Sequence, residues 1–179
     1  SYYSEVFGLD QLQRGIIAAA TEPMQIVAII VGIPLASRMM LRDPGLGLRL
    51  LAVFAVGIAL SLVGFVIAPV VWVAVLANIF ATALGALLMP GILASLSLVM
   101  PPKVRSLGFS LGSVFAIPGM VFLAIAASIA QAFSLRVGML AMVPIFLVGA
   151  WILSSASLFV RSDISRVWTS TAAQAEVRL

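Results

Sequence analysis

The sequence contains no cysteine and no histidine. Their absence excludes disulfide bonds, thiolate catalysis, zinc sites built on Cys or His, and every catalytic triad that uses an imidazole base. Charge is also scarce, because charged residues make up 9% of the 179 residues, against about 25% in soluble domains. Hydrophobic residues make up 63%. Such a chain cannot cover a globule with polar side chains, so we expect its surface to face lipid.

The few charged residues divide the sequence into long apolar runs. Residues 50–102 contain no charged side chain. As one helix this run would measure about 80 Å, whereas the hydrocarbon core of a bilayer is about 30 Å thick, so the run must fold back once. Because proline breaks the helical hydrogen-bond ladder, we expect the turn at Ala68-Pro69. The sequence therefore predicts five membrane-spanning helices, at residues 15–38, 48–68, 71–99, 106–133 and 137–160.

The basic residues predict the orientation of these five spans. With alternating spans, eight basic residues fall on one side, namely Arg38, Arg42, Arg49, Lys103, Arg105, Arg161, Arg166 and Arg178. The opposite side receives only Arg14 and Arg136. Because Lys and Arg gather in cytoplasmic loops, we expect an all-α, polytopic bundle in the plasma membrane with its N-terminus outside. Residues 1–14 then form an external loop and residues 161–179 a cytoplasmic tail.

Glu22 is the ionisable residue that lies well inside a predicted span. A carboxylate within a membrane is costly, so such a residue usually faces a cavity or a partner and marks a functional site. On this interpretation Glu22 handles a proton or the substrate. The alternative is a helix that starts later, with Thr21 as its N-cap and Pro23 in its first turn.

Asn78 and Thr82 supply further polar groups within the third span. The span that contains Asn78 enters the membrane from the same side as the span that contains Glu22. Thr82 lies one turn after Asn78 on the same helix face. These side chains line a polar path through the bundle, or they bond between helices. Because polar groups are so few in the spans, an apolar or amphipathic substrate is favoured.

Two proline-glycine pairs lie inside the spans, at Pro90-Gly91 and Pro118-Gly119. They are candidate hinges of a moving bundle. The alternative is ordinary packing, because small residues let membrane helices approach closely and proline kinks are tolerated among neighbouring helices.

Three segments carry a family resemblance. Residues 6–15 look like an external loop that leads into a membrane helix, and residues 101–108 look like a cytoplasmic loop that leads into a glycine-rich helix. Between them, residues 32–38 with Arg42, Asp43 and Pro44 form a Gly- and Arg-containing loop motif, in which Gly32, Arg38, Arg42 and Asp43 are the candidate residues. From Phe7 to Arg166 the chain resembles the carboxy-terminal half of a major facilitator superfamily transporter, although Ser37 stands at the position of the family's signature aspartate.

This resemblance implies that the five spans correspond to helices eight through twelve of a larger secondary transporter, whose amino-terminal half is missing here. It also implies transport of a small molecule by alternating access. One alternative is the membrane-spanning part of an ATP-driven pump, fused to or paired with an ATP-binding cassette, although no GxxxxGK motif occurs in this sequence. Another is a scaffold that transports nothing.

Enzymatic activity is not expected, because one buried carboxylate cannot supply both an acid and a base. Nor do we expect a cofactor or a metal. The basic residues do not form a patch interleaved with aromatic side chains, so nucleic acid is not an expected partner. The expected partners are the lipid bilayer, the missing half of the transporter, a small-molecule substrate and, for a pump, an attached ATPase domain.

Overall fold

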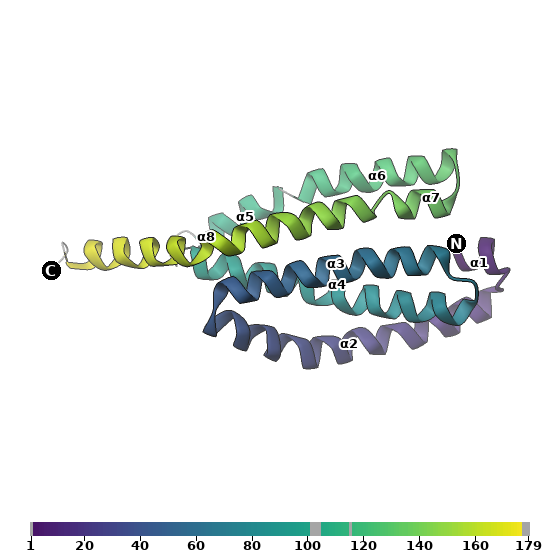
Figure 1. Ribbon diagram of the computed structural model, residues 1–179, viewed down its shortest axis with the longest axis horizontal. Helices are drawn as coiled ribbons and strands as arrows, with labels where there is room; N and C mark the ends of the chain where they lie inside the picture. The colour runs from purple at the N-terminus through teal and green to yellow at the C-terminus, as the bar shows by residue number, and fades with distance from the viewer. Residues whose placement is uncertain (1, 101–104, 115, 177–179) are drawn as a thin grey trace.

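The protein is described by a computed structural model that covers residues 2–100, 105–114 and 116–176. All regular secondary structure in these ranges is helical, which confirms the expected all-α class. Successive long helices run in opposite directions along one axis (Figure 1). In chain order the helices are α1 (Tyr2–Phe7), α2 (Gln11–Arg42), α3 (Pro44–Ile67), α4 (Val71–Val99), α5 (Arg105–Val114), α6 (Ala116–Ala132), α7 (Leu135–Leu140) and α8 (Val143–Glu176).

Helix α2 begins earlier than the sequence predicts, because Asp10 caps it. The Asp10 carboxylate accepts a hydrogen bond from the Gln13 backbone N–H at 2.8 Å, and the Gln13 side chain accepts one from the Asp10 N–H at 3.1 Å. This reciprocal pair is a capping box. The alternative start at Thr21 is wrong, since Thr21 lies well inside α2 and its hydroxyl donates to the Ile17 and Ala18 carbonyl oxygens. Much of the expected external loop is therefore helical.

A single residue, Asp43, separates α2 from α3. Its N–H donates to the Met39 carbonyl oxygen at 2.9 Å and closes α2, while its carboxylate accepts from the Gly45 N–H at 3.0 Å and opens α3. Pro44 occupies the first position of α3. A backbone N–H at this position has no partner within the helix, so proline loses no helical hydrogen bond there. The segment expected as a cytoplasmic loop is thus helical up to residue 42.

The other connections show where prolines end helices. Helix α3 ends at Ile67 and α4 begins at Val71, around the turn predicted from Pro69. Residues of the predicted fourth span are helical on both sides of residue 115, which lies outside the described residues, and carry the labels α5 and α6. The predicted fifth span is interrupted at residues 141–142 between α7 and α8, two residues before Pro144, whose ring nitrogen has no hydrogen to donate.

Several helices are long and apolar enough to cross a membrane. Among the described residues, four segments meet this description by length and composition, namely Gln11–Arg42, Pro44–Ile67, Val71–Leu98 and Leu135–Val160. A shorter apolar helix covers Ile117–Ala132. Four to five of the predicted spans therefore correspond to helices of suitable length.

Helix α3 lies at the centre of the bundle. It packs against α2, α4, α7 and α8, whereas α6 packs mainly against α7. The buried face of α3 includes Ala52, Ala55 and Ala59, and small residues of this kind let helices approach closely. The Leu51 side chain is fully buried and contacts α4 at Gly91, where a β-carbon would collide with it.

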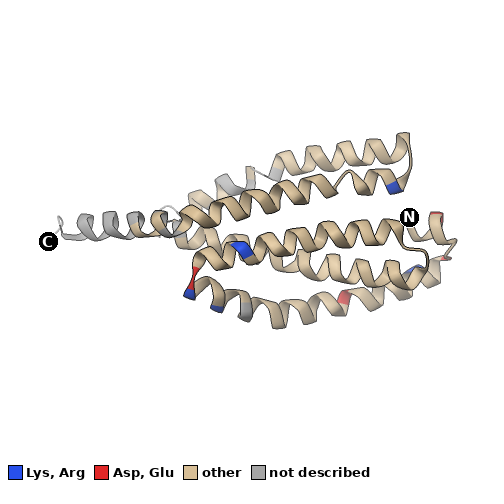
Figure 2. Ribbon diagram, viewed as in Figure 1, with Lys and Arg blue, Asp and Glu red and all other residues tan. Residues whose placement is uncertain are grey.

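The outside of the bundle is apolar. Many large apolar side chains are exposed on it; Trp72 and Trp151, for example, are 76% and 70% exposed. Soluble monomers rarely expose continuous apolar patches above a few hundred Å². Charged residues gather towards the ends of the bundle (Figure 2), and Glu22 is the acidic residue inside α2. This arrangement is compatible with a membrane protein. Lys103 and Arg178, which the orientation also uses, lie outside the described residues.

Candidate functional site

A recess opens between α1, α2 and α4, where α2 and α4 begin. Its volume is about 480 Å³. Tyr3 of α1 and Asn78 of α4 line it together with six residues of α2, namely Gln11, Arg14, Gly15, Ile17, Ala18 and Thr21. The recess therefore combines one guanidinium, one phenol and two side-chain amides with a short apolar wall.

Helix α1 is held in place by Tyr2, which is buried. The Tyr2 hydroxyl donates to the carbonyl oxygen of Val66 at 3.0 Å, and its ring lies 4.4 Å from the Phe65 ring between centroids. Both partners belong to the last turn of α3, where terminal carbonyls lack helical donors. This contact fixes α1 against the end of the bundle and places its neighbour, Tyr3, in the recess.

The Tyr3 hydroxyl is the least satisfied polar group of the recess. Its oxygen is buried and makes no hydrogen bond of normal geometry with the described residues. Burial raises the pKa of Tyr3 above the ordinary tyrosine value, and the nearby Asn78 side chain partly offsets that rise. The Asn78 amide thus lies near the hydroxyl without completing a well-formed hydrogen bond. Tyr3 consequently remains a neutral donor at physiological pH.

Asn78 and Thr82 are predicted to share one polar face, and the structure places them in different settings. Asn78 lines the recess. The Thr82 hydroxyl donates to the Asn78 and Ile79 carbonyl oxygens of its own helix, at 2.8 and 3.1 Å. Thr82 is therefore satisfied within α4 and does not belong to the recess lining.

Glu22 does not line the recess, although it adjoins Thr21, which does. The Glu22 side chain is exposed, whereas Thr21 is buried. On the same face of α2, one turn before and one turn after Glu22, Ala19 and Ile26 are exposed too, so this face of α2 is covered by no other described helix. The structure therefore does not bring Glu22 and Asn78 together.

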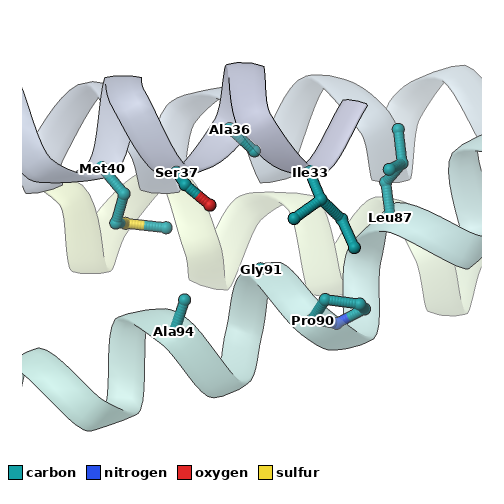
Figure 3. A pocket seen from close by; sticks show the side chains of 8 residues that line it. All are labelled: Ile33, Ala36, Ser37, Met40, Leu87, Pro90, Gly91 and Ala94. Atoms are coloured by element: carbon teal, nitrogen blue, oxygen red, sulfur yellow. The ribbon is translucent and has the colours of Figure 1, made fainter. Parts of the chain in front are cut away.

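A second, smaller cavity lies between α2 and α4 further along the bundle, with a volume of about 30 Å³. Ile33, Ser37 and Met40 point from α2 toward Pro90 and Gly91 of α4 (Figure 3). None of the described residues that line it is ionisable. Its walls are packing surfaces of two adjacent helices.

The loop-motif residues are distributed along α2 and its end. Gly32 packs closely against α4, since a β-carbon there would lie 2.5 Å from Leu87 Cδ2. Arg38 and Arg42 are exposed in the last turns of α2, and Asp43 is the connecting residue described above. The motif therefore consists of the C-terminal part of α2 and the residue that caps α3.

The hinge candidates lie in two different environments. Helix α4 continues from Val71 to Val99, so Pro90 does not interrupt it. Gly91 is buried against α3. By contrast, Pro118 lies within α6, and beyond the backbone of that helix no described atom lies within 4 Å of a β-carbon built on Gly119. Close packing explains Gly91, whereas the described residues show no such packing at Gly119.

Sequence reasoning missed Tyr3, Gln11 and Arg14, because it treated residues 1–14 as a loop. The capping pair of Asp10 and Gln13 was a usable signal, since it marks a helix start just before the apolar run. A comparison of this chain with known protein families, curated proteins and solved structures finds no match.

Proposed function

We propose that this chain is an integral membrane part of a larger secondary transporter, which moves a small molecule across the plasma membrane by alternating access. The observation that carries the proposal is the position of Glu22. Its carboxylate lies midway along an apolar helix that is long enough to cross a membrane, on a face that the rest of the described bundle leaves uncovered.

Lipid is an unfavourable neighbour for that carboxylate. Placing an acidic side chain at the centre of a membrane helix costs about 2.5–3.5 kcal/mol or more, so such residues face a partner or a water-filled path. A transporter built from two halves has such a path between them. In the proposal, the missing amino-terminal half covers this face of α2, and Glu22 borders the shared path.

The arrangement of charge supports the proposed orientation. Arg38, Arg42 and Arg49 lie at the end of the bundle where α2 meets α3, and Arg14 and Arg136 lie toward the other end. With the positive-inside rule, the N-terminus lies outside and α8 leads into the cytoplasm.

A membrane-spanning part of an ATP-driven pump is the second candidate, and helix α8 favours it. This helix continues to Glu176, well past the apolar segment that ends at Val160, and projects beyond the bundle (Figure 1). A rigid helix of this kind is suited to transmit motion between a membrane bundle and a cytoplasmic ATPase domain.

The test uses membrane vesicles from cells that express the protein with its natural flanking sequence. Uptake of radiolabelled benzoate, of ethidium and of N-phenylnaphthylamine is measured with an imposed pH gradient and, separately, with ATP. We expect gradient-driven uptake of one probe, a loss of about tenfold or more in Glu22→Gln, and no change in Glu5→Gln, which alters an exposed carboxylate outside the spans. Unchanged uptake in Glu22→Gln rejects its role, and uptake driven only by ATP favours the pump.

A further inference from the structure

We infer that the uncovered face of α2 is an interface with another membrane helix, and that this partner presents a lysine or arginine side chain to Glu22. The inference rests on the proposed function, because it names the group in the missing part of the transporter that pairs with this carboxylate. Its basis is the spacing of the exposed residues along α2, the isolation of Glu22 among them and the distribution of charge in the chain.

The exposed residues around Glu22 follow the spacing of a helix-packing seam. Six exposed residues of α2 are separated alternately by three and four positions, namely Leu12, Gly15, Ala19, Glu22, Ile26 and Ile29. Side chains with this seven-residue period form the contact between two helices that cross at about 20°, and most helix pairs in membranes cross in this way. This row of residues, the α2 seam, therefore suits a second helix that runs nearly along it.

A hollow in the surface of α2 allows the partner to come close. Its volume is about 620 Å³, and it is lined by Gln11, Leu12, Gly15, Ile16 and Ala19. Beyond the backbone of α2, no described atom lies within 4 Å of a β-carbon built on Gly15. Short residues such as Gly15 and Ala19 let membrane helices approach closely. The partner backbone can therefore lie near α2 just before Glu22, which brings its side chains within reach of the carboxylate.

Glu22 is the charged group of the α2 seam, and it is isolated within this fold. Among the described residues, no hydrogen bond or ion pair reaches its carboxylate. It lies eight residues after Arg14 and sixteen before Arg38, or about 12 and 24 Å along the helix. Glu22 is thus about 6 Å from the middle of that segment, well inside a hydrocarbon core of about 30 Å. Charged side chains at this depth pair with one another or line a polar path.

No copy of this chain can supply the opposite charge at that depth. Residues 50–102, 106–135 and 137–160 contain no charged side chain. Two copies of α2 packed in parallel would bring two Glu22 carboxylates to the same level, where like charges repel. A Lys or Arg of a different segment instead neutralises the carboxylate and donates hydrogen bonds to it. A single polar residue in a helix seam also fixes register and partner, so Glu22 selects the helix that covers α2.

The experiment first locates the partner by cross-linking. The protein is expressed with its natural flanking sequence, and the photo-reactive residue p-benzoylphenylalanine replaces Ile26 of the α2 seam or, as the control, Leu123 of α6. Both positions are 59% exposed, and α2 and α6 lie at opposite edges of the bundle (Figure 1). After illumination of intact membranes, mass spectrometry identifies the residue that is joined to the probe.

We expect the probe at position 26 to join a membrane helix outside residues 1–179, with a Lys or Arg within one helical turn of the cross-linked residue. The probe at position 123 should not give this product. Glu22→Gln should lower the yield at least threefold and Glu22→Lys at least tenfold, because the partner base then loses its counter-charge or meets a like charge. Changing that base to Glu in the Glu22→Lys protein should restore the yield to within twofold.

A product with a second copy of this chain, with lipid alone, or with a helix that has no base within one turn overturns the inference. So does an unchanged yield in Glu22→Gln, or an exchange of charges that restores nothing. Because cross-linking requires no transport, an exchangeable ion pair in a protein that moves no substrate would contradict the proposed function alone.

Discussion

The contact between α6 and α7 offers a sharp test of the packing, because it leaves no space for a single added methyl group. Gly138 of α7 is buried, and a β-carbon there would lie 2.8 Å from both the Ala126 carbonyl oxygen and the Ala130 Cα of α6, with Ala130 Cβ closer still. None of these atoms can move by a side-chain rotation. In Gly138→Ala, α6 and α7 must therefore move apart.

Gly149→Ala is the matched control, because beyond the backbone of α8 itself no described atom lies within 4 Å of a β-carbon built on Gly149. Replacing Gly by Ala inside a helix stabilises it by about 1 kcal/mol, and both variants receive this gain. Overpacking costs about 1–3 kcal/mol, and only Gly138→Ala incurs it. We therefore expect Gly138→Ala to be about 1–3 kcal/mol less stable than Gly149→Ala.

The assay is reversible unfolding by SDS titration in mixed micelles, followed by circular dichroism. Comparing the two variants with each other removes the shared helix-propensity gain from the result. Helix α6 packs mainly against α7, so a loosened contact should also raise hydrogen exchange in residues 116–132 more than in α3. Equal midpoints for the two variants would refute the close approach of α6 and α7.

Two further predictions concern the N-terminal helix and the orientation. Burial raises the folded-state pKa of Tyr3 above its value of about 10 in the unfolded chain, so the stabilisation of α1 is complete below about pH 10 and is lost as the pH rises through the higher folded value. Absorbance at 295 nm should show one tyrosine that ionises late, and Tyr3→Phe should remove that step. Because the chain has no cysteine, a thiol reagent labels only the introduced residue in the single variants Ser4→Cys and Ser162→Cys. An impermeant maleimide added to intact cells should react only with the Ser4→Cys variant. Reaction only with the Ser162→Cys variant would mean the opposite orientation.

The sequence predicts well those features that local chemistry determines. The turn at Ala68-Pro69 follows from a charge-free run that is too long for one span, and α4 occupies residues 71–99, as predicted. The interruption at residues 141–142 was missed because an apolar run of suitable length reads as one span, even though Pro144 marks the break. Length and composition give the number of apolar segments more reliably than the continuity of each helix.

The recess could not be predicted, because it depends on contacts between distant residues. Its position follows from the hydrogen bond of Tyr2 to Val66, 64 residues away, and no local pattern announces that contact. Asn78 was correctly singled out as a polar residue within a span, but its neighbours in the recess come from a segment expected to be a loop. Likewise, only the packing of α2 on α4 decides that Glu22 faces outward.

The central position of α3 has a consequence for how the bundle is assembled during synthesis. One of its main neighbours, α8, begins only at Val143. At about 5–20 residues per second, α3 waits roughly 4–15 s for that partner. During this delay the face that carries Ala52 and Ala55 meets lipid, which is as apolar as its later partner. A chain whose synthesis stops after α4 would therefore keep this face of its central helix against lipid instead of against α8.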